Sequence, residues 1–336
     1  MSQTVVVTGA SGGIGRATAI AFARRGDRVA LLARGEKGLA AAAEDVRAAG
    51  GTPLVVPVDV SDAEAVEAAA DRVERELGPI DVWCNCAFST VFARFEDVSP
   101  EEWTRATAVT YFGFVNGTRA ALRRMKPRNR GVVVQTGSAL AYRGIPLQSV
   151  YCGAKHAIKG FTESVLTELK NEGSGVRVTV VNAPGVNTPQ FDWVLNKLPK
   201  RPQPVAPIYQ PEVMAGAMVH ASEHPRRRAW QVGISTVYTI LGEKVSPQFV
   251  DWYLARNGVE GQQTDRDTRP TDPVNLWEPA DGPDGRDFGA RGRFSDEAWT
   301  RDPQIWASRH HGAVAVLGAA ATAGIGVGLA SLRNRR

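Results

Sequence analysis

The chain alternates apolar runs with stretches of helical periodicity over roughly its first 185 residues. The apolar runs cover residues 5–9, 28–33, 53–59, 80–85, 131–137 and 176–183. The helical patterns lie between them, at about 13–25, 36–49, 62–77, 101–125 and 150–172. Strands that are apolar throughout and are separated by helices are typical of a parallel sheet covered on both faces. The pattern therefore predicts an α/β fold with a doubly wound parallel sheet, which binds ligands at the carboxyl ends of its strands.

The pattern changes in the next part of the chain. Residues 186–212 are rich in proline and contain a short apolar piece at 191–198. A long connection of this kind after a late strand predicts a mobile lid over the ligand site. A helix is predicted over about 211–223, a last strand near 229–233, and a further helix that ends near Gly258.

An irregular arm follows. Residues 259–311 are dense in Asp, Arg, Gly and Pro, which indicates a segment without regular structure. Its aromatic residues are expected to pin it to the main body: Trp277, Phe288, Phe294, Trp299 and Trp306. The predicted organisation is a main domain at 1–258, an arm at 259–311 and an apolar helix at 312–332.

The apolar segment 312–332 carries no charged side chain. As a helix it would be about 31 Å long, close to the hydrocarbon thickness of a bilayer. Gly324 and Gly328 have a spacing that suits close helix packing in a membrane. The high content of Ala and Gly also agrees with a helix in water or against a partner protein. Two alternatives follow: a membrane tail that leaves the main domain in the cytoplasm, or a helix outside the membrane.

Composition and charge narrow the choice of partners. The net charge of +5 is modest, and the densest basic run, Arg123 to Arg130, is expected to be a solvated helix end rather than a nucleic-acid site. The three cysteines form an odd set without framework spacing, which indicates a reducing, cytoplasmic compartment. His220 and His224 have the spacing of two metal ligands on a helix, but no further ligand pattern accompanies them, and no metal site is predicted.

A glycine-rich turn, TGASGGIG at residues 8–15, joins the first strand to the first helix. Its motif glycines allow a tight turn and a close backbone approach, and the free N–H groups of the helix attract a pyrophosphate. The strand–turn–helix context predicts a dinucleotide-binding turn. The cofactor contacts expected here are Gly9, Ser11, Gly13, Ile14 and Gly15.

The ends of the next two strands bear on the choice of cofactor. Arg34 follows the second strand, where an acidic residue would bond the ribose 2′-hydroxyl and repel a 2′-phosphate. A guanidinium matches a phosphate instead, which predicts NADP(H). Asp59 and Val60 follow the third strand and are placed in the cofactor site. Asp59 is expected either to bond the adenine amino group or to cap the next helix, next to Ser61.

Ser138, Tyr151 and Lys155 form a candidate catalytic set. Tyr151 and Lys155 are four residues apart in a predicted helix and so share one face, and Ser138 follows the preceding strand. An ammonium group next to a phenol lowers the pKa of the phenol from about 10. Tyr151 can then exchange a proton with an alcohol or carbonyl oxygen, and the Ser138 hydroxyl can hold the same oxygen.

With these motifs the chain resembles the short-chain dehydrogenase/reductase family over about residues 3–258. The resemblance extends to a Pro-Gly turn at Pro184 and Gly185, followed by Thr188. It implies a Rossmann-type sheet of seven parallel strands and hydride transfer between a nicotinamide and a carbonyl or alcohol. It also implies a dimer or tetramer.

The same resemblance implies residue roles. Tyr151 would be the general acid and base, Ser138 would polarise the substrate oxygen, and Lys155 would bond the nicotinamide ribose. The further cofactor contacts that it implies are Asn85, Ala87, Pro184, Gly185 and Thr188.

Three features depart from the family pattern. The sequence NCAF at 85–88 replaces the usual NNAG, and 230–245 replaces the usual glycine-rich ending. Thr110 stands where the family often has an Asn that holds a water of the proton relay. We expect the Thr110 hydroxyl to hold that water, which makes Thr110 a fourth candidate catalytic residue.

Three functions agree with the motifs. The first is a carbonyl reductase or alcohol dehydrogenase that uses NADP(H) on a small, apolar substrate. The lid residues that indicate an apolar pocket are Phe191, Trp193, Leu195 and Leu198. The second is a non-catalytic NADP(H)-binding scaffold or sensor at a membrane. The reason to consider it is that Thr110 replaces the usual Asn. The third is an epimerase or dehydratase that keeps its cofactor bound.

Overall fold

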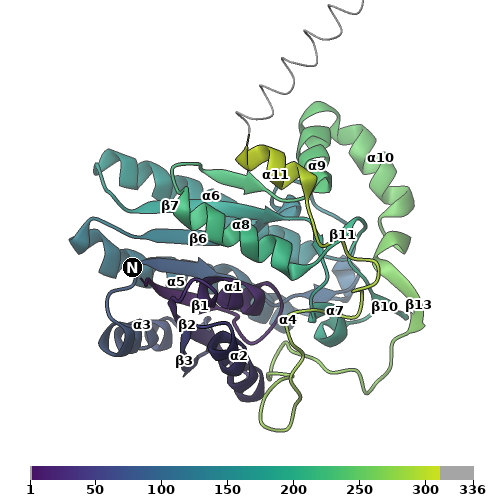
Figure 1. Cartoon of the computed structure of the whole chain (residues 1–336). Helices are drawn as coiled ribbons and strands as arrows, with labels where there is room; N and C mark the ends of the chain where they lie inside the picture. Colours follow the sequence, from purple (N-terminus) through teal and green to yellow (C-terminus); the bar gives the residue numbers. More distant parts are fainter. Residues whose placement is uncertain (1, 311–336) are drawn as a thin grey trace, which may run out of the picture.

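The computed structural model describes residues 2–310, and its centre is a sheet of seven parallel strands (Figure 1). The strands lie in the order β12, β7, β6, β4, β1, β2, β3. Their bounds are β1 Thr4–Thr8, β2 Arg28–Ala33, β3 Thr52–Pro57, β4 Val82–Asn85, β6 Val132–Ser138, β7 Arg177–Ala183 and β12 Ala229–Gln231. The predicted doubly wound α/β fold is confirmed. The strand order reverses between β1 and β4, which is where such sheets bind ligands.

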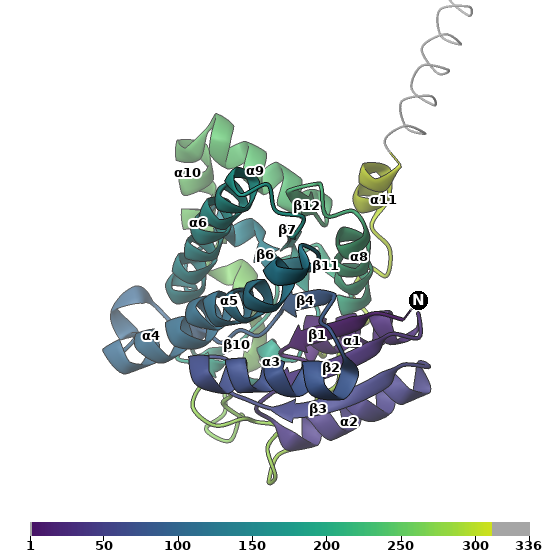
Figure 2. The same cartoon turned by 90° about the vertical axis from the view of Figure 1, so that its left-hand side faces the viewer.

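Helices cover both faces of the sheet (Figures 1 and 2). One layer consists of α1 (Gly13–Ala23), α2 (Glu36–Ala48) and α8 (Pro211–Glu223), and the other of α3 (Ala63–Leu77), α5 (Gly113–Met125) and α6 (Ser149–Asn171). Val5 and Val7 of β1 pack into the first layer and Val6 into the second, because successive side chains of a strand point to opposite faces. The unbroken apolar runs therefore supply two separate cores.

The helical pattern predicted over 101–125 is interrupted in the structure. It consists of α4 (Pro100–Thr107), a π-helical turn η2 (Ala108–Phe112) and α5. Such turns often occur at functional sites, and this one directs Val109 into a pocket that includes the glycine-rich turn.

Short strand pairs tie the connection predicted as a lid to the main body and to the arm, and join its own two ends to each other. Its elements are β8 (Gly185–Val186), α7 (Gln190–Trp193), β9 (Leu195–Asn196), β10 (Lys200–Pro202) and β11 (Ile208–Tyr209). β9 pairs with β5 (Val91–Phe92), β10 with β13 (Gln263–Asp267), and β11 with β8. These pairings hold both ends of the connection in place.

Two helices follow β12, where the sequence predicted one. α9 (Ile234–Val245) was not expected, whereas α10 (Pro247–Asn257) matches the pattern that ends near Gly258. The remaining elements are η1 Phe95–Asp97, η3 Lys126–Arg128, η4 Ala139–Ala141, η5 Glu260–Gln262 and α11 Pro303–Arg309. In Figure 1, α9 and α10 stand together at one end of the sheet, near α11.

Most of the arm is irregular, as predicted, and part of it is pinned by aromatic contacts. Phe294 is buried against Phe191, with ring centroids 6.0 Å apart, and Phe288 packs on Trp193 at 4.7 Å. Residues 2–310 contain no helix long and apolar enough to span a membrane. The segment 312–332 lies outside the described residues, so its membrane or water location stays a prediction.

Candidate active site

The glycine-rich turn lies between β1 and α1, at the reversal of strand order. Gly9 and Gly13 have positive φ angles of 66° and 55°. A Cβ on Gly9 would stand 2.8 Å from the Cα of Ala87, so both conformation and space require glycine there. No side chain caps α1, whose N-cap residue is Gly12. The turn therefore provides the glycine-lined cradle and the helix N-terminus that a dinucleotide pyrophosphate requires.

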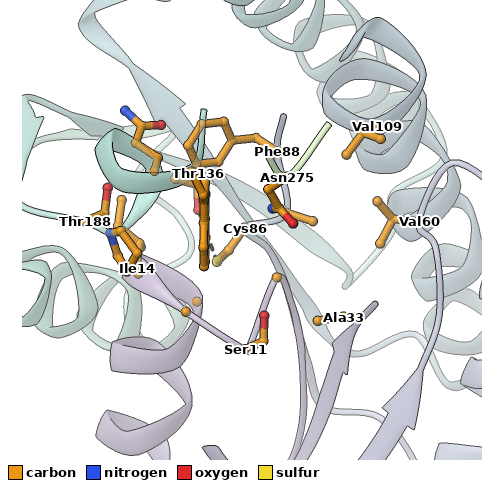
Figure 3. A pocket seen from close by; sticks show the side chains of 18 of the residues that line it. Ser11, Ile14, Ala33, Val60, Cys86, Phe88, Val109, Thr136, Thr188 and Asn275 are labelled. Carbon is orange, nitrogen blue, oxygen red and sulfur yellow. Dashed lines mark hydrogen bonds between the residues drawn. The ribbon is translucent and has the colours of Figure 1, made fainter. Parts of the chain in front are cut away.

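A pocket extends from this turn across the carboxyl ends of the strands (Figure 3). Most of the predicted cofactor residues line it: Gly9, Ser11, Gly13, Ile14, Gly15, Arg34, Asp59, Val60, Ala87, Tyr151, Lys155, Pro184 and Thr188. Gly185 lines an adjoining cavity instead. Other lining residues were not found from the sequence, among them Cys86, Phe88, Val109, Asn275, Pro279 and Asp281.

Asn85 lies behind the pocket, in a buried polar network. Its amide nitrogen donates to Gln135 Oε1 at 2.9 Å, and its Oδ1 accepts from the indole N–H of Trp83 at 2.9 Å. Gln135 also donates to Thr118 Oγ1 at 2.8 Å. Because these bonds occupy its amide group, Asn85 joins β4 to β6 and α5. It does not line the cofactor pocket, although the resemblance implied that it contacts the cofactor.

Thr110 is fully buried in the π-helical turn. Its hydroxyl donates to the carbonyl of Ser89 at 2.6 Å and accepts from the N–H of the same residue at 2.8 Å. Since its one proton is used in this way, Thr110 fixes the chain after β4 and has no donor left for a relay water.

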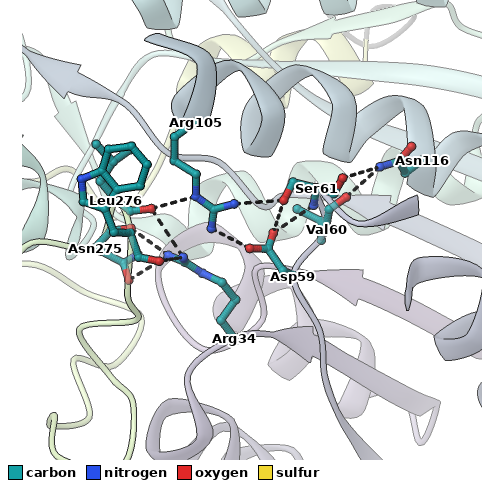
Figure 4. A network of polar contacts seen from close by, with 9 residues as sticks. Arg34, Asp59, Val60, Ser61, Arg105, Asn116, Asn275 and Leu276 are labelled. Atoms are coloured by element: carbon teal, nitrogen blue, oxygen red, sulfur yellow. Dashed lines mark hydrogen bonds and ion pairs between the residues drawn. The ribbon is translucent and has the colours of Figure 1, made fainter. Parts of the chain in front are cut away.

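Asp59 lies just beyond β3 and is held from two sides (Figure 4). Its carboxylate accepts from the hydroxyl of Ser61 at 2.7 Å and from Arg105 of α4 at 2.5 Å. Burial opposes ionisation, but these bonds and that from the Ser61 N–H outweigh it and hold the pKa of Asp59 below its usual value. The cap of α3 is Asp62, so neither Asp59 nor Ser61 has that role. The adenine contact of Asp59 stays a prediction.

Arg34 lies beyond the end of β2, and the arm holds its guanidinium (Figure 4). It donates to the carbonyl oxygens of Asn275, Leu276 and Trp277 at 2.8, 3.4 and 2.7 Å. Burial, and after it the charge of Arg105, lowers the pKa of Arg34. The end of β2 therefore places a positive charge on the nucleotide side of the pocket. Backbone oxygens of the arm accept the hydrogen bonds of this guanidinium.

Ser138 and Tyr151 both line the cavity that adjoins the pocket, and Tyr151 lines the pocket as well. Ser138 ends β6, and its Oγ accepts from the N–H of Leu140 at 3.1 Å, which leaves its own proton available. Tyr151 lies near the start of α6. Burial raises the pKa of Tyr151, while the Ser138 hydroxyl acts in the opposite direction. The phenol is therefore protonated near neutral pH and placed to donate.

Lys155 lies one helical turn after Tyr151. Its Nζ donates to the carbonyl of Thr136 at 2.8 Å and lies 4.6 Å from the ring centroid of Phe114. Burial lowers the pKa of Lys155 to about 7. The sequence predicted that an ammonium here lowers the pKa of Tyr151. In this structure desolvation is the largest cause of both pKa shifts. It favours the neutral form of Lys155 and the neutral phenol of Tyr151.

This burial predicts how the Lys155→Met change alters stability. Unfolded Lys155 keeps its proton to about pH 10.4, whereas the folded group loses it near pH 7, so wild-type stability rises with pH between these values. The methionine variant lacks this rise. We expect it to gain about 2–4 kcal/mol in unfolding free energy over the wild type below pH 7, and less as the pH approaches 10.

Urea unfolding at pH 6.5 and 9.5 measures this difference. Lys170→Met, an exposed site on the same helix, is the matched control and should show no such trend. A constant difference between Lys155→Met and wild type across pH would contradict the lowered pKa.

A second cavity, of about 620 Å³, opens at Ser138 and Tyr151. Its outer walls come mainly from α9, α10 and the connection 186–212, including Phe191, Val205, Tyr238, Phe249, Tyr253 and Leu254. Of the four apolar lid residues singled out in the sequence, only Phe191 lines it. Arg143 also lines it, but its guanidinium is paired with Glu243 of α9 at 2.9 Å and Asp251 of α10 at 2.5 Å. That arginine therefore clamps the two helices.

Comparisons with known proteins agree with this geometry. A family model described as short chain dehydrogenase matches residues 3–197, more than half of the chain. The chain belongs to the short-chain dehydrogenase family. An uncharacterised oxidoreductase of Bacillus subtilis, YxnA, is 31% identical over 301 residues, which are 89% of this chain and 82% of that protein. A 3-ketodihydrosphingosine reductase of Bos taurus is 34% identical over 192 residues, or 56% of this chain and 57% of that protein.

A solved structure gives the same result. An alcohol dehydrogenase of the archaeon Thermococcus sibiricus, complexed with 5-hydroxy-NADP, matches with a TM-score of 0.60 and 26% identity, over 69% of this chain and 96% of that one. The protein is therefore an oxidoreductase of the short-chain dehydrogenase type, acting on CH–OH or C=O groups with a nicotinamide cofactor.

Two of the departures from the short-chain dehydrogenase pattern at 85–88, Cys86 and Phe88, line the pocket beside Tyr151. Phe88 packs edge-on against Tyr151, with ring centroids 5.7 Å apart. Cys86 accepts from the Thr136 hydroxyl at 3.2 Å, and burial raises the pKa of its thiol to about 11. A protonated, buried thiol and an aromatic ring give this member an apolar wall beside Tyr151.

His220 and His224 line neither the cofactor pocket nor the second cavity. Together with Glu223 they place possible metal ligands within 4.8 Å of one another. The two imidazole rings stack at 4.0 Å, and His220 packs on Trp230 at 4.8 Å. Glu223 pairs with Arg25 at 2.7 Å. These contacts account for the cluster without an ion, and we propose no metal for it.

Proposed function

We propose that the protein is an NADP(H)-dependent carbonyl reductase or alcohol dehydrogenase for an apolar substrate. The observation that carries the proposal is the cavity of about 620 Å³ that begins at Ser138 and Tyr151 and is walled by aromatic and aliphatic side chains. It adjoins the cofactor pocket, because both are lined by Tyr151 and Pro184. A carbonyl carbon placed at this junction would have its hydrocarbon part in the larger cavity.

The residues at the junction have separate roles in the transfer of the proton. A nicotinamide bound in the adjoining pocket would supply or accept the hydride. Tyr151 donates its phenolic proton to the carbonyl oxygen in reduction and takes it back in oxidation. Ser138 donates its free proton to the same oxygen and so fixes its position. Lys155, held by the Thr136 carbonyl, stabilises the phenolate that remains whenever the lysine is charged.

The preference for NADP(H) rests on Arg34. A guanidinium at this strand end suits a 2′-phosphate, and the pocket includes the glycine-rich turn for the pyrophosphate. The similar archaeal alcohol dehydrogenase is complexed with an NADP derivative, which favours the same choice.

An apolar substrate predicts a dependence on chain length. With NADPH, we expect kcat/KM for linear 2-ketones to rise about 200-fold from 2-butanone to 2-octanone, because each of the four added methylenes contributes about 0.8 kcal/mol when it is buried. The similarity to a 3-ketodihydrosphingosine reductase supports extending the series to long-chain 3-ketones. The measurement is NADPH oxidation followed at steady state.

Several outcomes would contradict this function. Equal rates along the series, or a preference for small polar ketones, would contradict the proposal that the substrate is apolar. The absence of any oxidation would favour the non-catalytic scaffold, and turnover without net oxidation would favour an epimerase or dehydratase. Tyr151→Phe protein serves as the control that the oxidation comes from this site.

A further inference from the structure

The arm covers the nucleotide half of the cofactor pocket. Asn275, Pro279 and Asp281 form part of the pocket wall, although they lie far along the chain from the glycine-rich turn. The carbonyl of Gly289 accepts from the N–H of Gly13 at 3.2 Å, at the start of α1. Backbone oxygens of the arm thus occupy donors at two places that a dinucleotide would use, the start of α1 and Arg34.

Asp281 is the one acidic side chain that the arm contributes to this wall. It is 3% exposed, and its Oδ2 has no hydrogen-bond partner within residues 2–310. A Cβ on Gly35 or on Gly38 would overlap its carboxylate group. The carboxylate is therefore pressed against the first turn of α2 without a bond that would explain its burial.

That position attracts anions. α2 is 13 residues long, and its N-cap residue, Gly35, supplies no side-chain cap. The N–H groups of Lys37 and Gly38 donate to the backbone carbonyl of Asp281, at 3.1 and 3.4 Å. The start of a helix has a partial positive charge, and Arg34 directly precedes it. We call the space between Arg34, Gly35 and Gly38 the 2′-phosphate site.

We infer that the carboxylate of Asp281 occupies the 2′-phosphate site, so that NADP(H) binds by displacing it and Asp281 sets the affinity for NADP(H). The inference rests on the proposed pairing of Arg34 with the 2′-phosphate. Two anions cannot share this site, because like charges at contact distance repel strongly where water is excluded. NAD(H) lacks the 2′-phosphate, and its binding does not require the same displacement.

The Asp281→Asn change tests the inference, because it removes the charge and keeps the shape. Oδ2 of the lost carboxylate has no hydrogen-bond partner within the described chain, so the fold should tolerate the amide. Calorimetric titration of the full-length protein should show NADPH bound at least about tenfold more tightly by the variant, and NADH changed by less than about threefold.

A matched control is available in the same arm. Asp284 is exposed, so Asp284→Asn makes the same charge change away from the pocket and should leave both affinities unchanged. Asp281→Ser is the second variant, with the same expectation as Asp281→Asn, should the amide perturb the arm.

The possible outcomes separate the inference from the proposed function. Unchanged or weaker NADPH binding by both Asp281 variants would overturn the inference. Weaker NADH binding by about tenfold would also overturn it, and would make Asp281 an acceptor for the ribose hydroxyl. Arg34→Ala in the Asp281→Asn background tests the proposed cofactor. If that change does not weaken NADPH binding, the NADP(H) assignment to Arg34 fails, whatever the effect of Asp281.

Discussion

Replacing Tyr151 with phenylalanine should lower kcat for ketone reduction by about 10²- to 10⁴-fold, the usual contribution of a positioned acid or base. The change removes one hydroxyl group at the junction of the two cavities and leaves the ring that packs on Phe88. Neither the glycine-rich turn nor Arg34 is touched. The dissociation constant for NADPH should therefore stay within about threefold of the wild type, measured by the same titration.

A second tyrosine in the cavity of about 620 Å³ provides the control. Tyr253 of α10 lines the same cavity, in a wall away from β6. Tyr253→Phe makes the same chemical change and should alter kcat by less than about threefold. Equal losses in the two variants would show that Tyr151 acts through packing and not as the proton donor.

Replacing Gly15 with alanine should abolish cofactor binding and destabilise the protein. A Cβ on Gly15 would lie 2.7 Å from the carbonyl carbon of Gly9 and closer still to its oxygen. These are backbone atoms of the tight turn, so no side-chain movement can relieve the overlap. We expect a loss of about 3 kcal/mol or more in unfolding free energy, measured by urea unfolding, together with loss of NADPH binding.

Gly160→Ala separates this local overlap from the general effect of the substitution. Gly160 is an exposed residue in the middle of α6, and a Cβ there would meet nothing within 4 Å. Alanine favours a helix over glycine by about 1 kcal/mol, so this variant should be as stable as the wild type or more stable. Wild-type NADPH affinity in the Gly15→Ala protein would mean that the turn can rearrange.

The sheet could be predicted from the sequence because its cause is local. The runs at 5–7 and 29–33 are apolar at every position, which is typical of a strand buried on both faces. The glycine-rich turn and the Ser138, Tyr151 and Lys155 set could be located for a similar reason. Their positions at strand ends and on one helix face follow directly from the order of elements.

The contacts of the arm could not be predicted in this way. Residues 259–302 show no periodicity, and nothing near Asp281 in the sequence indicates that it reaches the start of α2. Asn85 and Thr110 show the same difficulty, although both lie at positions that the family resemblance singled out. Their positions in the sequence matched the family, but buried partners on distant elements decided where their polar groups point. The pKa of Lys155 likewise depends on burial that appears only in the folded chain.

The bond between Arg34 and Asn275 also has a consequence for the order of events on the ribosome. These residues are 241 positions apart. At about 5–20 residues per second, translation separates their appearance by roughly 10–50 s. During that interval the first βαβ unit and its glycine-rich turn have emerged, while the segment that covers them has not yet been made. The nascent chain therefore presents an uncovered nucleotide site that the finished protein no longer has.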